Sequence, residues 1–290
     1  MRNQALIAGS LLFIYAAYAR GEIQPTGADD TASIQAALDS GETQIGSGHF
    51  TVSSPIVIPE SQTLTGAGMG KTVLEMTPTA PGETRSAVIM LRSNSSVENL
   101  TVTSTSANCN GIVADGGAWP GIDVHDASVS SCEVHHAATH VYGIWGHKAP
   151  SFAVDRCIVD GGCTTLDNSI GQEGIELFGC DGASVRNCLV SHCGRGGITL
   201  FGEAVSADNI LIEACQASSC TFGILVTVNG DESAGITHVL IRKNIIDASG
   251  SADIAVTSGS QGVISCEFEK NLYSSQYVCG TGKQLVMVSR

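Results

Sequence analysis

The stretch Val154-Asp155-Arg156-Cys157-Ile158-Val159 and the later dipeptide Gly174-Ile175 form one copy of a two-part pattern that decides the fold. The first part is an apolar residue, two mostly polar residues, a Cys, Leu or Asn, and further apolar residues. Its copies begin at Val97, Val129, Val154, Val185, Ile212 and Ile241, with a weaker one at Val263. The second part is Gly-Ile followed by alternating residues, with isoleucines at Ile112, Ile144, Ile175, Ile198, Ile224 and, in the variant Asp-Ile, Ile254.

Each copy contains two short segments in which apolar and polar residues alternate, which is the pattern of a half-buried strand. One such unit cannot bury its apolar face alone, but units stacked on one another form a continuous core. Successive copies of the first part begin 22 to 32 residues apart, and no amphipathic stretch long enough for a helical repeat lies between residues 97 and 268. The repeat therefore predicts an all-β solenoid of parallel strands.

The composition fits this prediction and limits the partners. The chain has 290 residues and no linker interrupts the repeat, so we expect one elongated domain. A formal net charge of −14 argues against nucleic acid, whose phosphates would be repelled. The same charge opposes an acidic glycan unless a local basic side chain or a bridging cation offsets it.

The ends of the chain differ from the repeat. A charged start, an apolar run over residues 5–19 and the small residues around Ala19 are typical of a secretory signal, and the run is short for a membrane span. We expect a signal peptide over residues 1–19, a secreted or periplasmic protein, and no stable membrane span after cleavage. Residues 20–45 are expected to hold a short helix that covers the first coil, residues 46–271 the solenoid, and residues 272–290 a tail that covers the last coil.

The N-terminal motifs resemble the pectate-lyase-like superfamily. They are the run from Gly27 to Leu38 (Gly-Ala-Asp-Asp-Thr-Ala-Ser-Ile-Gln-Ala-Ala-Leu), the strand Gly48-His49-Phe50-Thr51-Val52 and the turn Leu64-Thr65-Gly66-Ala67-Gly68. The resemblance covers about residues 25 to 270 and implies a single-stranded, right-handed parallel β-helix. The superfamily includes polysaccharide lyases, glycoside hydrolases, epimerases and phage tailspikes, so it implies action on or binding of a polysaccharide without choosing among them.

The eleven cysteines follow the repeat. Equivalent positions of stacked coils lie about 4.8 Å apart, which is wider than the usual Cβ separation in a disulfide. We therefore expect columns of buried thiols at the fourth position (Cys132, Cys157, Cys188, Cys215 and Cys266) and at a second position (Cys193 and Cys220). The pairing of Cys109, Cys163, Cys180 and Cys279, which lie outside these columns, stays open.

Chemistry is expected around residues 125–192, where six of the eight histidines and an insertion at about Gly162 to Gln172 lie. Alignment of the repeats places His135 beside Asp160, Tyr142 beside Glu173, and Arg195 nearby. An imidazole held by a carboxylate exchanges protons near neutral pH, and a guanidinium binds carboxylates. Residues expected to bind the sugar are His136, His140, Trp145, His147, Glu176, Phe178, His192 and Phe201.

These positions suggest β-elimination of a uronate-containing glycan. His135, oriented by Asp160, would take the proton, Tyr142 would assist the leaving oxygen, and Arg195 with Glu173 would position the carboxylate.

Three alternatives stay open. The same cleft could hydrolyse a glycoside with Glu173 and Glu176, or epimerise a uronan. It could also belong to a non-catalytic glycan-binding module or tailspike adhesin, which would form a trimer where an enzyme would be a monomer. The motifs of polygalacturonases and mannuronan epimerases are absent from the chain. No cofactor is required by these schemes, and Ca²⁺ held by Asp155, Asp160 and Asp181 is an open alternative.

Overall fold

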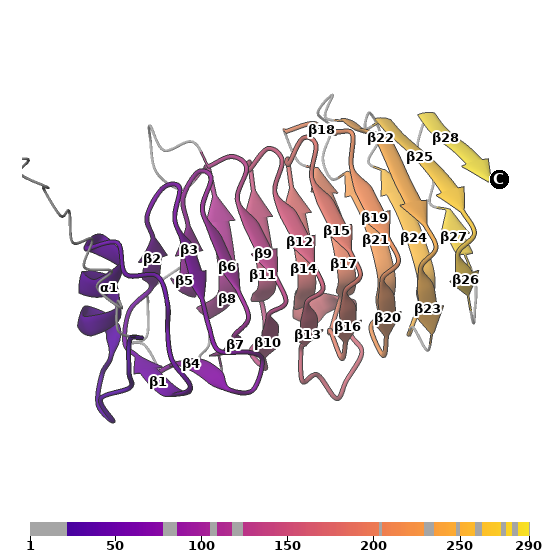
Figure 1. The fold of residues 1–290 in the computed structure, drawn as a ribbon. Coiled ribbons are helices and arrows are strands. Elements are labelled where there is room, and N and C mark those ends of the chain that lie inside the picture. The colour runs from indigo at the N-terminus through magenta and orange to yellow at the C-terminus, as the bar shows by residue number, and fades with distance from the viewer. Residues whose placement is uncertain are drawn as a thin grey trace, which may run out of the picture.

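The computed structural model describes residues 22–77, 86–104, 109–117, 124–202, 205–228, 235–247, 250–258, 263–273, 277–279 and 284–289. The expected signal peptide, residues 1–19, lies outside the described residues. Each coil of the chain contributes one strand to each of three parallel sheets, and the coils stack into an elongated solenoid (Figure 1). The predicted parallel β-helix is therefore confirmed.

The three sheets, here called sheets I, II and III, take their strands in the order of the chain. Sheet I consists of β1 (Gly48–Val52), β4 (Thr72–Met76), β7 (Thr101–Ser104), β10 (Glu133–His136), β13 (Ile158–Asp160), β16 (Leu189–Ser191), β20 (Gln216–Ser218), β23 (Ile245–Asp247) and β26 (Leu272–Tyr273). Sheet II consists of β2 (Ile56–Ile58), β5 (Ser86–Leu91), β8 (Cys109–Asp115), β11 (Tyr142–His147), β14 (Glu173–Phe178), β17 (Gly196–Gly202), β21 (Phe222–Val228), β24 (Ala252–Ser258) and β27 (Tyr277–Cys279). Sheet III consists of β3 (Thr63–Thr65), β6 (Ser96–Glu98), β9 (Ser128–Ser130), β12 (Ala153–Asp155), β15 (Ser184–Arg186), β19 (Leu211–Glu213), β22 (Gly235–Arg242), β25 (Val263–Glu269) and β28 (Gln284–Ser289), with β18 (Ala207–Asp208) beside β22.

The register follows the sequence repeat. Val129, Val154, Val185 and Ile212 are direct partners on neighbouring strands of sheet III. Ile144, Ile175, Ile198 and Ile224 form the corresponding column of sheet II. All of them are buried, so each column stacks like side chains along the core.

The glycines before Ile144 and Ile175 are required by packing. A Cβ at Gly174 would lie 2.3 Å from a methyl carbon of Val190, and one at Gly143 would lie 2.5 Å from a methyl carbon of Val159. Any side chain there would overlap the core, so only glycine fits. This close approach also fixes the backbone of β14 beside Glu173.

The helix α1 (Thr31–Asp39) lies at the N-terminal end of the stack, where it buries Ile34 and Leu38 against the first coil (Figure 1). Its N-cap residue Asp30 makes no capping bond through its side chain. The buried Asp30 carboxylate instead accepts hydrogen bonds from the Thr26 and Thr51 amides, at 2.8 and 3.2 Å. It thus ties the helix to β1. At the other end, the tail from Leu272 adds one strand to each sheet.

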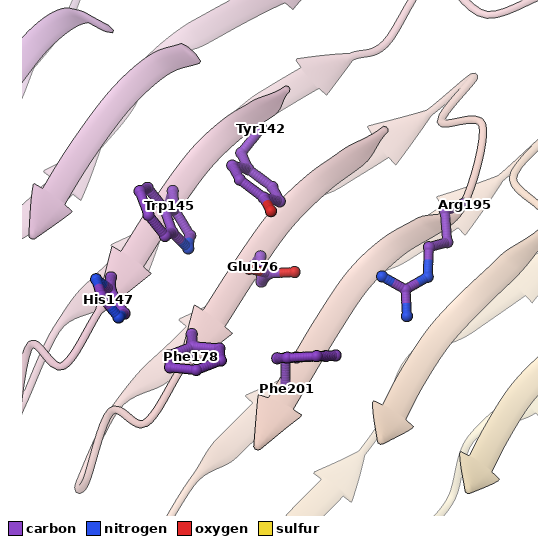
Figure 2. A pocket seen from close by; sticks show the side chains of 7 residues that line it. All are labelled: Tyr142, Trp145, His147, Glu176, Phe178, Arg195 and Phe201. Atoms are coloured by element: carbon purple, nitrogen blue, oxygen red, sulfur yellow. The ribbon is translucent and has the colours of Figure 1, made fainter. Parts of the chain in front are cut away.

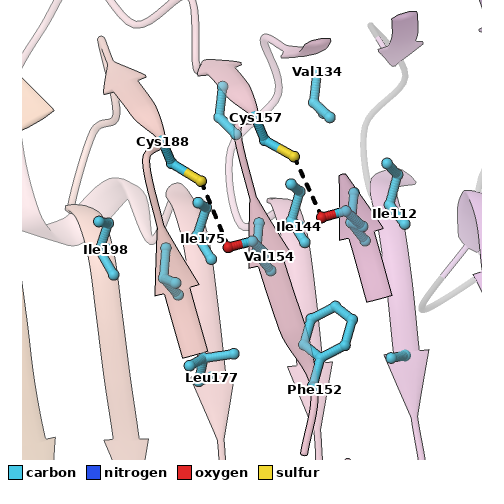
Figure 3. Packing of buried hydrophobic residues seen from close by; sticks show 14 of the residues in the cluster. Ile112, Val134, Ile144, Phe152, Val154, Cys157, Ile175, Leu177, Cys188 and Ile198 are labelled. Carbon is cyan, nitrogen blue, oxygen red and sulfur yellow. Dashed lines mark hydrogen bonds between the residues drawn. The ribbon is translucent and has the colours of Figure 1, made fainter. Parts of the chain in front are cut away.

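The predicted thiol column is confirmed at Cys132, Cys157, Cys188 and Cys215, which are buried and free. The Cys157 and Cys188 thiols point at the main-chain oxygens of Val129 and Val154, with Sγ···O distances of 3.7 and 3.8 Å (Figure 3). Cys193, Cys220 and Cys180 are likewise buried and free, Cys109 is buried, and Cys163 is free but partly exposed. Of Cys279 only the backbone is described.

The prediction for Cys266 was wrong. Ile241 pairs with Phe268 and not with Val263, so the last copy of the first part begins at Phe268, and Cys266 instead pairs with Val239. The fourth position of the last two copies is therefore Asn244 and Asn271, whose side chains are hydrogen-bonded at 3.0 Å. The thiol column continues as an asparagine column in which each amide also bonds a main-chain oxygen of the preceding coil.

Candidate functional site

A pocket of about 330 Å³ opens on the outer face of sheet II. Outward positions of β11, β14 and β17 supply most of its wall, since residues on one face of a strand alternate with core residues. Figure 2 shows the Glu176 side chain in the middle, with the other lining side chains around it. The lining residues are Tyr142, Trp145, His147, Glu176, Phe178, Arg195 and Phe201.

Strand register brings these residues together from three coils. Tyr142 pairs with Glu173, Trp145 with Glu176, and His147 with Phe178. Phe178 in turn pairs with Phe201 on β17. The expected columns of sheet II are therefore confirmed, and seven of the thirteen candidate side chains line one pocket.

The aromatic rings form a continuous series along the pocket wall. Ring centroids lie 5.0 Å apart for Tyr142 and Trp145, 5.0 Å for Trp145 and His147, 4.9 Å for His147 and Phe178, and 5.3 Å for Phe178 and Phe201. The guanidinium carbon of Arg195 lies 5.8 Å from the Phe201 ring centroid, within the range of a cation–π contact. These contacts hold the rings in place before any ligand arrives.

Glu173 lies fully buried beside the pocket and is bound on both carboxylate oxygens. Nη1 of Arg195 donates to Oε1 at 2.7 Å, and the Thr199 hydroxyl donates to Oε2. Burial raises the pKa of Glu173, while Arg195 and Thr199 oppose the rise. This arrangement holds Arg195 against the pocket wall.

Glu176 is the second carboxyl of β14 and is almost fully buried. Its pKa is raised well above the usual range, first by burial and then by the neighbouring Glu173 carboxylate, while Arg195 opposes the rise. The Trp145 indole N–H lies near enough to favour the ionised form weakly, but not in hydrogen-bond geometry. Because one guanidinium serves two carboxyls and is bonded to Glu173, we assign the negative charge to Glu173 and the proton to Glu176.

His147 is held by Asp115, with 2.6 Å between Nδ1 and Oδ1. Both side chains are largely buried, and the same Asp115 oxygen accepts the Gly117 amide at 2.8 Å. A carboxylate accepts, so Nδ1 donates and Nε2 is left as the proton acceptor of the ring. His147 and Asp115 therefore form the imidazole–carboxylate pair of this pocket.

The pair expected from the sequence, His135 and Asp160, lies on sheet I and does not line the pocket. Their backbones are partners as expected, but the side chains bond elsewhere. His135 Nε2 lies 3.1 Å from Glu133, and Asp160 Oδ1 lies 3.1 Å from His192 Nδ1. The arrangement in which Asp160 orients His135 was wrong, because outward side chains of one sheet column have several partners within reach.

The other expected sugar contacts among the histidines also fall outside the pocket lining. His136 points into the coil, is almost fully buried and has no hydrogen-bond partner on either ring nitrogen within the described residues. His140 and His192 are exposed residues of turns with positive φ angles of 57° and 52°. The inserted loop from Gly162 to Gln172 contains the short 3₁₀ helix η1 (Asn168–Ile170) and supplies no lining residue.

Two residues that matter in this geometry were not among the sequence candidates. Thr199 follows Glu176 in its column, and Asp115 precedes His147 in the next one. A search of each column for a polar neighbour one coil earlier or later would have found both.

No metal centre emerges from the described residues, where no group of three or more His, Cys, Asp or Glu side chains converges. Asp155 is bonded to Arg156 and Asn187, and Asp181 to the Asp208 amide. Likewise, no described helix has the length and apolar character needed to cross a membrane.

Comparison with known structures gives the same architecture. The A-module of the Azotobacter vinelandii mannuronan C-5 epimerase AlgE4 superimposes with a TM-score of 0.57 at 14% identity, over 93% of this chain and 96% of that one. The Dettilon tailspike protein gp208 gives 0.56 at 13% identity, over 92% of this chain and 60% of that one. The catalytic domain of a GH87 alpha-1,3-glucanase gives 0.54 at 12% identity, over 93% and 57%.

At these identities the likeness concerns the fold alone. A search among curated proteins finds no match. The family model for the right-handed beta helix region matches residues 86–272, which is more than half of the chain and includes every lining residue of the pocket. The protein belongs to the right-handed β-helix family.

Proposed function

We propose that the pocket of sheet II binds a polysaccharide and cleaves a glycosidic bond, with Glu176 as the proton donor. One observation carries this proposal: a buried carboxyl group with a raised pKa lies at the centre of a ring of aromatic side chains. Two structural neighbours, a mannuronan epimerase and an alpha-1,3-glucanase, support a glycan as the ligand.

The shape and lining of the pocket suit a sugar. Its volume of about 330 Å³ lies within the range common for small-ligand pockets. The ring faces of Trp145 and Phe178 offer flat apolar surfaces, while Glu176 and His147 offer polar groups between them. A sugar ring presents the same combination of an apolar face and polar edges.

The chemistry of cleavage follows from the two proton-exchanging groups. Glu176, whose pKa is raised by burial, can donate a proton to the glycosidic oxygen as the bond breaks. His147, oriented by Asp115, offers Nε2 as acceptor for a proton from a water molecule or from the sugar. The aromatic rings exclude bulk water from the carboxyl group and so maintain its protonated form.

The test is the release of oligosaccharides from a panel of neutral, acidic and amino polysaccharides, followed by mass spectrometry. We expect the wild type to cleave at least one of them and Glu176→Gln to lose about 100-fold or more of the rate, as removal of a general acid usually does. Glu75→Gln is the matched control, since Glu75 lies on β4 of sheet I, half-exposed and paired with His49. Cleavage by the Glu176 variant at the wild-type rate would contradict the assignment.

Elimination at a uronate is the second candidate, and the presence of Arg195 in the pocket wall favours it. In that case His147 would take the proton beside the carboxylate and Glu176 would protonate the leaving oxygen. The two reactions differ in their products, because elimination leaves a double bond that absorbs ultraviolet light and hydrolysis leaves none. Binding without any product would instead indicate an adhesin.

A further inference from the structure

The charged groups of the pocket wall other than Glu176 are bonded in two pairs, Arg195 with Glu173 and His147 with Asp115. Arg195 lines the wall with 23% of its side chain exposed, and its bonded partner Glu173 is fully buried. The Thr199 hydroxyl holds the second oxygen of the same carboxylate. The positive charge of the guanidinium is therefore already balanced by a protein anion.

The remaining groups add no positive charge. His147 is bonded to Asp115, so even a protonated ring would be balanced by that carboxylate. Glu176 has no ion-pair partner among the described residues and holds its proton through burial. Summed over these five side chains, the pocket is neutral or negative.

We infer that the ligand of this pocket is an uncharged glycan and not a polyuronate, because the pocket has no positive charge left to balance a ligand carboxylate. The inference rests on the proposed function in that it takes the pocket as a glycan site. It narrows the substrate class from polysaccharides in general to those with neutral sugars at the cleaved bond.

Binding of a uronate would cost free energy because it would disturb the pair of Arg195 and Glu173. A ligand carboxylate would have to share or replace Glu173 on Arg195, and Glu173 would then remain fully buried as an unpaired anion. The chain as a whole carries a net charge of −14, which also repels a polyanion. An amino sugar is disfavoured for a different reason, since its ammonium group would leave water without a free carboxylate partner, as Glu173 and Asp115 are already bonded.

The test uses matched pairs of oligosaccharides that differ only in charge. Each uronan oligomer is compared with its carboxyl-reduced counterpart, and each N-acetylated amino-sugar oligomer with its deacetylated counterpart. Binding to the wild type is followed by the change in tryptophan fluorescence, since Trp145 lines the pocket. We expect the uncharged member of any bound pair to bind at least tenfold more tightly, with little change between 0.05 and 0.5 M salt, where screening would weaken charge-driven binding.

The variant Glu173→Gln tests the cause. It frees the Arg195 guanidinium, so we expect uronate binding to rise at least tenfold. Thr199→Val is the matched control, because it removes a bond to the same carboxylate without freeing Arg195, and no gain for uronates is expected. If the Glu173 variant does not fold, the binding of the matched oligosaccharide pairs to the wild type still tests the inference.

The outcomes separate the two proposals. Tighter binding of a charged member, together with loss of cleavage in Glu176→Gln, would overturn the neutral-glycan inference and leave the cleavage proposal standing. Tighter binding of the neutral member without any cleavage would support the neutral-glycan inference and overturn the cleavage proposal. Failure of every pair to bind would overturn both.

Discussion

Arg195 and Glu173 are ion-paired across neighbouring coils, with 2.7 Å between Nη1 and Oε1, although 22 residues separate them in the chain. Glu176 lies on the same strand as Glu173 and has no such partner among the described residues. One strand therefore carries two buried carboxyls with different environments. That difference underlies both the assignment of the proton and the first two predictions.

Removing Arg195 should destabilise the protein strongly. Arg195→Ala leaves Glu173 buried without its cation, and we expect the free energy of unfolding to fall by about 3 to 5 kcal/mol. The double variant Arg195→Ala/Glu173→Gln should lose less than the sum of the two single changes. Urea unfolding followed by circular dichroism measures all three.

The matched control for this experiment is Arg156→Ala. Arg156 is paired with Asp155 on the solvent side, with 62% of its side chain exposed, so we expect a much smaller loss. Equal losses of unfolding free energy for Arg195→Ala and Arg156→Ala would show that the buried pair of Arg195 and Glu173 contributes no more than an exposed pair.

Glu176 should make stability depend on pH. Its pKa is higher in the folded protein than in the unfolded chain, so its contribution is complete below the ordinary value near 4.5 and is lost as the pH rises through the folded value. Each pKa unit of difference corresponds to about 1.4 kcal/mol. The free energy of unfolding of Glu176→Gln, compared with that of the wild type, should therefore be higher at pH 8 than at pH 4. A difference between the two proteins that stays constant with pH would contradict the raised pKa.

His136 should have the opposite effect. Burial lowers its pKa from 6.5 to about 4, with the neighbouring Asp160 offsetting only part of the change. The neutral ring is thus favoured in the folded protein, and its contribution is complete above pH 6.5 and lost as the pH falls towards 4. From these two values we expect about 2 kcal/mol of lost stability between pH 8 and pH 5.

The variant His136→Phe keeps an aromatic ring that cannot be protonated, so the acid-sensitive part should disappear. His238→Ala is the control, since His238 is an exposed surface residue paired with Asp208. Urea midpoints at pH 5 and pH 8 give the comparison. Equal acid sensitivity of the wild type and His136→Phe would refute the assignment.

The thiols should differ sharply in reactivity. Among the ten described cysteines only Cys163 is partly exposed, and burial raises the pKa of Cys132 and of Cys180 to about 12. We expect a thiol reagent to modify Cys163 rapidly in the native protein and the others only after unfolding. Peptide mapping by mass spectrometry identifies the sites, and Cys163→Ala should abolish the rapid phase at the described positions. Rapid labelling of Cys157 or Cys188 would mean that the column is not buried as described.

The repeat predicted much of the backbone because a parallel coil allows few registers. Once Ile144 and Ile175 of the Gly-Ile dipeptides occupy one column, their neighbours in sequence place Tyr142 beside Glu173 and Trp145 beside Glu176. The slip at Cys266 came from beginning the last copy at Val263, whereas Phe268, 27 residues after Ile241, is the residue that continues the column.

Side-chain partners were less predictable than columns. His135 and Asp160 are backbone partners, yet each bonds another residue, because several outward side chains lie within reach of one another. The choice among them depends on rotamers and on the local exposure of each group. His136 was also misplaced by the sequence prediction. It follows His135 on β10, and because successive residues of a strand face opposite sides, its ring lies in the core and not on the outer face.

By itself the sequence determined the parallel coils, the buried thiol column and the strand positions of the aromatic residues, since each depends only on the period of alternation and on the spacing of the repeats. Only the tertiary structure decided that Arg195 is taken by Glu173, that Asp115 holds His147, and that Glu176 stays without a partner. The physical reason is that charge pairing depends on distances of a few ångströms between side chains of different coils, which a register alone does not specify.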